Sequence, residues 1–317
     1  MSFLPRLTTA ASRTPRLLAA LCLGGALTLS AAPRTTQAAA GASVVVQTVA
    51  AENEYANVIK QIGGSYVSVL GIMSNPTVDP HTYESSTTDA SAIARAQLVI
   101  QNGVGYDDFM GHLEAASPGP HRTIVDVGSL LGLKSGVNPH LWYNPPTMPR
   151  VAARIADVLS ADDPADKATF HANLTTFVAA LKPWTAALNA LRQHYKGTPV
   201  AVTEPVFDYT LRAAGLTILT PPRFELTIQE GNDPSPQDAQ TEATLLSQKK
   251  VKAFFYNQQA VEPVTSKLLG IARARHIPIV GVYETMPLSK TYQSWMLAEV
   301  MSIDRALGRG VSTERLQ

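Results

Sequence analysis

The chain has 317 residues, 45% of them hydrophobic, which is enough for a substantial core in one large domain or two small ones. Its single cysteine, Cys22, lies in an apolar run near the amino terminus. The rest of the chain can therefore form no disulfide, and any metal site must use nitrogen and oxygen ligands. The chain has 26 basic and 25 acidic residues and no basic run. It therefore lacks the cluster of positive charge with which proteins bind nucleic acids.

Residues 1–40 have the layout of a secretory signal peptide. Three arginines precede an apolar run over residues 17–29, and small residues follow up to Ala40. The run is too short to span a bilayer comfortably, so we expect cleavage near residues 38–40 and a soluble periplasmic or extracytoplasmic protein. The alternative is an uncleaved membrane anchor. Leu21 precedes Cys22 where a lipoprotein signal has a small residue, which argues against lipidation.

Removal of this segment changes the charge balance, because it carries four arginines and no acidic residue. The remaining 22 basic and 25 acidic residues give a net charge of −3.

In the first half of the chain, β-rich runs alternate with helical patterns. Strands are predicted over residues 43–49, 67–73, 98–103 and 123–128, and helices over residues 53–64 and 87–96. This alternation is typical of βα units with a mostly parallel sheet. A helix ending near residue 162 follows, and then a helical region of about 30 residues that Pro183 is expected to kink.

The βα alternation resumes after Gly197. Strands are predicted over residues 199–204, 216–222, 253–257 and 278–283, and helices over residues 235–250, 261–276 and 292–307. The prediction is therefore an α/β fold with two lobes, each a mostly parallel sheet flanked by helices, joined by a long backbone helix. The expected segments are a signal peptide (1–40), an amino-terminal lobe (41–162), a linking helix (163–196) and a carboxy-terminal lobe (197–317).

Ligands of parallel α/β lobes bind beyond the carboxyl ends of the strands. His81 follows the second predicted strand, Glu204 and Glu284 follow later strands, and His140 lies in an irregular stretch before a helix. Both histidines come directly after a proline, which restricts the backbone and suits a preorganised ligand. Each histidine alone has an ordinary loop or core interpretation that is equally plausible.

Together the four side chains form a more specific pattern, because two neutral imidazoles and two carboxylates suit Zn²⁺, Mn²⁺ or Fe²⁺ and balance the charge of the ion. Residues 256–259, with the sequence YNQQ, are candidates for orienting these ligands. The other histidines fall on helical or turn-rich stretches and are expected to lie at the surface or in packing positions: His112, His121, His171, His194 and His276.

Four ordered motifs resemble the metal-binding solute-binding proteins of bacterial ABC transporters, which serve zinc and manganese importers. The motifs are VDPHTYE followed by a helix, a strand ending in Asn-Gly and a Tyr-Asp pair; NPHLWYNP; VTEPVFDYTLRAAGL; and VYETMPLSKTYQSWM. The similarity runs from about residue 43 to residue 307. The resemblance implies two lobes joined by a rather rigid helix, with a metal ion in the cleft between them. His81 and His140 would come from the first lobe, and Glu204 and Glu284 from the second.

Two departures from the family pattern indicate which ion the site favours. The third ligand of zinc-handling members is usually histidine, whereas Glu204 resembles the manganese-handling members. The fourth is usually aspartate, and here it is Glu284. These departures, and the lack of a His/Asp/Glu-rich loop, favour Mn²⁺, although Zn²⁺ is intrinsically bound more tightly at most such sites.

The function that the resemblance implies is capture of Zn²⁺ or Mn²⁺ as a bound substrate ion, with delivery to a membrane permease. A monomer without enzymatic activity is expected. The alternative is a secreted metal-dependent hydrolase, in which Asp79, Glu84 or Asp208 would activate water. Neither a His-Glu-x-x-His helix nor a Gly-x-Ser-x-Gly elbow occurs in the sequence, so neither motif supports that alternative.

Overall fold

The computed structural model describes residues 45–77 and 80–316. The predicted signal peptide and Asp79 lie outside these ranges, as does the side chain of His81. The described residues belong to one compact unit, and this unit alone is described below. The lobe boundaries expected within it remain predictions. Among the described residues, no helix is long and apolar enough to cross a membrane.

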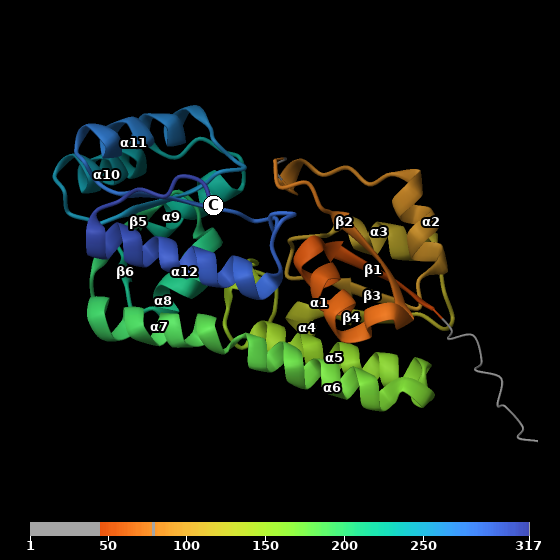
Figure 1. Ribbon diagram of the computed structural model, residues 1–317. Coiled ribbons are helices and arrows are strands. Elements are labelled where there is room, and N and C mark those ends of the chain that lie inside the picture. Colours follow the sequence, from red (N-terminus) through yellow and green to blue (C-terminus); the bar gives the residue numbers. More distant parts are fainter. Residues whose placement is uncertain (1–44, 78–79, 317) are drawn as a thin grey trace, which may run out of the picture. The chain divides into compact units, whose positions relative to one another are not determined.

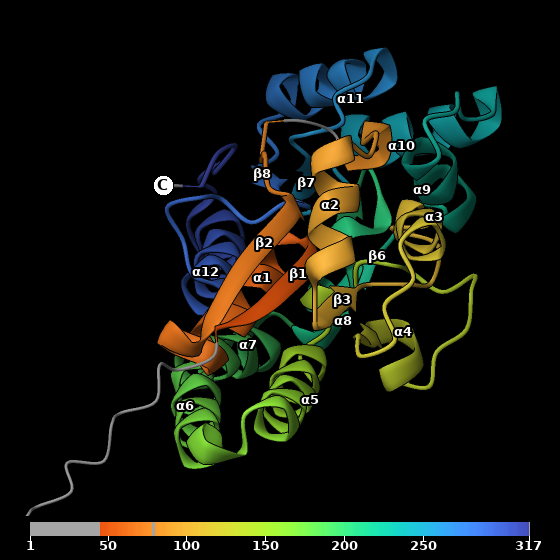
Figure 2. The ribbon, with the colours of Figure 1, turned by 90° about the vertical axis from the view of Figure 1, so that its right-hand side faces the viewer.

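The first sheet has four parallel strands in the order β2-β1-β3-β4. Figure 2 labels β2, β1 and β3 of this sheet. The strands are β1 (Val46–Glu52), β2 (Val67–Met73), β3 (Leu98–Gln101) and β4 (Thr123–Asp126). The helices of this part are α1 (Asn53–Gly63), α2 (Thr87–Arg95), α3 (Phe109–Ala116) and α4 (Val127–Leu130). Helix α2 begins at a capping box in which Ser86 and Asp89 satisfy each other's main-chain N–H groups.

The second sheet is also parallel, with the order β6-β5-β7-β8. Its strands are β5 (Pro199–Val202), β6 (Thr217–Ile218), β7 (Phe254–Asn257) and β8 (Ile279–Val282). The associated helices are α8 (Asp208–Ala213), α9 (Pro222–Gln229), α10 (Pro236–Ser247), α11 (Pro263–Ala274) and α12 (Tyr292–Arg309). The two sheets confirm the predicted α/β class with two lobes.

Three successive helices follow the first sheet: α5 (Thr147–Asp162), α6 (Lys167–Ala180) and α7 (Lys182–Tyr195). The last two fall in the segment predicted as the linking helix, residues 163–196. Helix α5 packs against α6, and α7 packs against α12 (Figure 1). The long helix predicted here is divided at Leu181, and Pro183 lies in the first turn of α7. A proline is well tolerated there because a first-turn N–H has no intrahelical acceptor, so the expected kink takes the form of a new helix start.

Both lobes contribute to a single large hydrophobic cluster. Helix α1 buries Val58, Ile59 and Ile62 at helical spacing, and strand β5 adds Val200 and Val202 to the same cluster. The cluster includes large buried aromatic side chains, among them Trp142, Tyr143, Trp184, Tyr292 and Trp295. This shared cluster packs the two lobes against one another.

The observed strands differ most from the prediction at two places, and most of the others are one or two residues shorter than predicted. Strand β1 begins three residues later than expected, at Val46, and continues to Glu52. The strand expected over residues 216–222 is only Thr217–Ile218, because Pro222 begins helix α9, which the sequence patterns did not predict.

Candidate metal site

The carboxyl ends of three adjacent strands bring together three polar side chains. In the second sheet β7 lies between β5 and β8, so Asn257 at the end of β7 lies between Glu204, which follows β5, and Glu284, which follows β8. All three residues are buried. The parallel topology therefore accounts for the meeting of side chains that are up to 80 positions apart in sequence.

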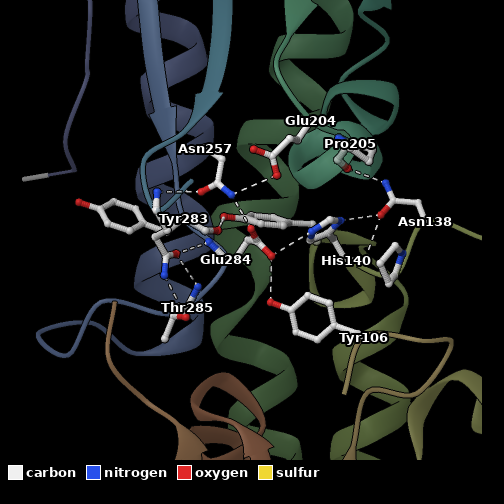
Figure 3. Close-up of polar contacts among 12 residues, drawn as sticks. Tyr106, Asn138, His140, Glu204, Pro205, Asn257, Tyr283, Glu284 and Thr285 are labelled. Carbon is white, nitrogen blue, oxygen red and sulfur yellow. Dashed lines mark hydrogen bonds and ion pairs between the residues drawn. The ribbon is translucent and has the colours of Figure 1, made fainter. Parts of the chain in front are cut away.

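Glu284 lies at the centre of the contacts (Figure 3). Its Oε2 accepts a hydrogen bond of 2.9 Å from the Tyr106 hydroxyl and lies 3.2 Å from His140 Nε2. Its Oε1 accepts a short hydrogen bond from Asn257 Nδ2. The main-chain N–H groups of Glu284 and Thr285 both donate to Gln259 Oε1, at 2.7 and 2.9 Å. Glu284 thus contacts side chains of both lobes.

His140 is fully buried and is oriented by Asn138. The Asn138 Oδ1 accepts the main-chain N–H of His140 at 3.0 Å and lies 2.8 Å from its Nδ1. Asn138 Oδ1 has no hydrogen to donate, so Nδ1 carries the hydrogen of this contact, and Nε2 faces Glu284. Since Nε2 and a carboxylate oxygen are both acceptors, a contact of 3.2 Å between them requires a proton or a cation.

Glu204 joins this group through Asn257. Its Oε2 accepts a hydrogen bond of 3.3 Å from Asn257 Nδ2, the same nitrogen that donates to Glu284. Pro205 follows Glu204, and its carbonyl accepts a hydrogen bond of 2.6 Å from Asn138 Nδ2. Asn138 therefore links the loop of His140 to the segment of Glu204.

The structure brings three of the four predicted ligands into one connected group: His140, Glu204 and Glu284. The fourth, His81, lies in a short 3-10 turn, Pro80–Thr82, and its side chain is outside the described residues. Within the described parts of the chain, no three His, Cys, Asp or Glu side chains are arranged to hold an ion as they stand. The four-ligand site accordingly remains a prediction.

The orienting role suggested for residues 256–259 agrees with the contacts of Asn257 and Gln259. Sequence reasoning assigned no role to Tyr106 or Asn138. The Tyr-Asp pair of the first motif included Tyr106, and the Asn-Pro-His order is the signal that could have identified Asn138, because an Asn side chain readily accepts main-chain N–H groups two residues on.

A group of buried acidic residues lies beside the site. Burial is the main cause that raises the pKa of Glu52 well above its ordinary range, with a smaller contribution from the charge of Asp107. Burial also raises the pKa of Glu54 to about 8 and raises that of Asp107. Glu54 is therefore mostly protonated at pH 7, and the charge beside the site is smaller than the number of carboxyl groups suggests.

Comparisons with known proteins identify the family to which the chain belongs. The family profile described as zinc-uptake complex component A, periplasmic (ZnuA) matches residues 48–306. A metal ABC transporter substrate-binding lipoprotein, FimA of Streptococcus parasanguinis, is 25% identical over 268 residues, covering 79% of this chain and 83% of the relative. A manganese ABC transporter substrate-binding lipoprotein, PsaA of Streptococcus anginosus, is 25% identical over 66% of this chain and 71% of its own.

The fold is also that of a solved structure, the periplasmic zinc-binding protein TroA from Treponema pallidum. The two agree with a TM-score of 0.70 at 20% identity, over 84% of this chain and 99% of TroA. Fold and relatives define a metal-binding solute-binding protein of an ABC transporter, which is not an enzyme. The chain belongs to the ZnuA family, the periplasmic A component of zinc-uptake complexes.

Proposed function

We propose that this protein captures Mn²⁺ or Zn²⁺ with His81, His140, Glu204 and Glu284 and delivers the ion to a membrane permease. The observation that supports this proposal is the 3.2 Å contact between His140 Nε2 and Glu284 Oε2, which joins the two lobes in a buried position. A cation there would replace the proton that this contact otherwise requires, and two carboxylates would balance its double charge.

The ligand types bear on the identity of the ion. Oxygen ligands suit Mn²⁺, whereas imidazole suits Zn²⁺, so the second carboxylate in place of the histidine usual in zinc-handling members favours Mn²⁺ as the transported ion. Zn²⁺ is expected to bind the isolated protein as well, because it stands above Mn²⁺ in intrinsic affinity. The name of the family profile refers to zinc and that of PsaA to manganese, so both ions belong in the test.

The cellular setting follows from the same proposal. The protein would work outside the cytoplasmic membrane as a monomer, after removal of residues 1–40. A secreted hydrolase, the alternative considered from sequence, has no support among the relatives.

Calorimetric titration of the metal-free protein with Mn²⁺ and Zn²⁺ tests the proposal. His140→Ala and Glu204→Ala are expected to lower the affinity at least tenfold, because each removes a ligand that no nearby group in a stiff loop replaces. His81→Ala is expected to lower the affinity to a similar degree, although the side chain of His81 lies outside the described residues. His194→Ala, at an exposed position on α7, is the matched control. Wild-type affinity in His81→Ala and His140→Ala would refute the ligand set.

A further inference from the structure

Helix α1 contacts the carboxy-terminal lobe through a row of uncharged amide side chains. Asn53, Asn57 and Gln61 are spaced four residues apart, so they lie on one face of the helix. All three form hydrogen bonds with residues 286–293, which comprise the end of the loop after β8 and the start of α12. We call these contacts the amide seam.

The bonds of the amide seam are well defined. Asn53 Nδ2 donates to the Met286 carbonyl at 2.7 Å, and the Met286 N–H donates to Asn53 Oδ1 at 3.0 Å. The Tyr292 N–H donates to Asn57 Oδ1 at 3.0 Å. Gln61 and Gln293 donate to one another, at 3.0 and 2.8 Å.

Asn53 differs from the other members because it pairs with both main-chain groups of Met286, two residues after Glu284. A side-chain amide has the donor and the acceptor that such pairing needs, whereas aspartate has no donor when ionised. Asn53 is buried, so water competes little for either bond. On the other side of the same loop, Gln259 accepts the N–H groups of Glu284 and Thr285. The loop that carries Glu284 is thus held from both lobes.

We infer that Asn53 is a positioning residue for the proposed metal site, holding the Glu284 loop against the amino-terminal lobe, close to His140. The inference rests on the proposed function, because it assigns Asn53 a role in metal affinity without contact with the ion. A partner that orients a ligand in this way typically contributes roughly 10- to 100-fold to metal affinity. Loss of Asn53 should act mainly through faster release of the ion, since the loop would leave its ligating position more often.

Two measurements on the full-length protein test this inference, with exchange and affinity measured from the metal-free form and ion release from the metal-loaded form. The first is hydrogen exchange, followed by mass spectrometry, of a peptide covering residues 284–291. The second is the affinity for Mn²⁺ and Zn²⁺ and the rate at which a chelator removes each ion. The variants are Asn53→Ala and the near-isosteric Asn53→Asp, which keeps an acceptor and serves if the alanine variant does not fold. Gln61→Ala, at the far end of the amide seam, is the control.

In Asn53→Ala we expect faster exchange of residues 284–291, roughly 10-fold or greater loss of affinity and a faster release rate, with Gln61→Ala within about threefold of wild type. Unchanged exchange in Asn53→Ala would overturn the inference. Faster exchange with wild-type affinity would also overturn it, because the loop would then be held without consequence for the ion. If the wild-type protein bound neither ion, the proposed function would fail, and the exchange comparison would still decide whether Asn53 holds the loop.

Discussion

Glu242 should make the stability of this protein depend on pH between 5 and 8. Its side chain is fully buried on α10, and one oxygen accepts a hydrogen bond of 3.2 Å from the Thr220 hydroxyl. Burial raises its pKa from 4.5 to about 8. Because the folded state holds the proton more tightly, the stabilisation is complete below pH 4.5 and is lost as the pH rises toward 8.

The size of the effect follows from the shift. Each pKa unit corresponds to about 1.36 kcal/mol, so the free energy of unfolding should fall by about 3–4 kcal/mol between pH 5 and pH 8 through this group alone. Glu242→Gln removes the titration and keeps an oxygen that can accept the Thr220 hydroxyl. The variant should therefore match the wild-type protein at pH 5 and exceed its stability at pH 8.

Urea unfolding followed by tryptophan fluorescence at pH 5, 6, 7 and 8 measures this difference directly. Glu230→Gln, at an exposed position just after α9, is the control and should run parallel to wild type at every pH. Parallel curves for Glu242→Gln and wild type would refute the reasoning, because they would mean that Glu242 has the same pKa in the folded and unfolded states.

Three further outcomes are expected. Trp184→Ala should lower the free energy of unfolding by about 3–5 kcal/mol in urea titrations, since Trp184 is buried and packs edge-on against Tyr292 at a centroid distance of 6.0 Å. Gly281→Ala should cost about 1–3 kcal/mol in the same assay, because a Cβ there would meet the Glu314 main-chain oxygen; a wild-type midpoint would contradict this contact. Saturating Mn²⁺ or Zn²⁺ should raise the melting temperature in calorimetry by an amount that grows with ion concentration, and an unchanged transition would count against the site.

Much of the fold could be predicted because local patterns and tertiary structure agree. Strand β2 has the predicted bounds, and α1 ends within one residue of its double-glycine signal. Proline and glycine supply these boundaries through backbone sterics, which act within a few residues. Helix α9 was missed because its first turn contains Pro222, and two adjacent prolines were interpreted as the end of a strand and not as a helix start.

The candidate site was also predictable only where local sequence features identify its residues. His140, Glu204 and Glu284 could be chosen because each occupies a strand end or a rigid loop, which are local features. The amide seam could not be predicted, because Asn53 and Met286 are 233 positions apart and nothing in either local sequence indicates the other. The spacing of Asn53, Asn57 and Gln61 shows a polar face on α1, but a polar helix face more often contacts solvent than a second lobe.

The amide seam contains no charged side chain, and this has a consequence for the conditions in which the lobes stay together. Ion pairs at a surface weaken as dissolved salt screens their charges. Hydrogen bonds made by carboxylates or imidazoles change in strength when those groups titrate. Bonds between neutral amides and the main chain do neither. The bonds of the amide seam should therefore hold equally well in dilute and concentrated salt, and the group beside them that titrates is Glu54, whose pKa burial raises to about 8 and which interacts with the Met286 main chain.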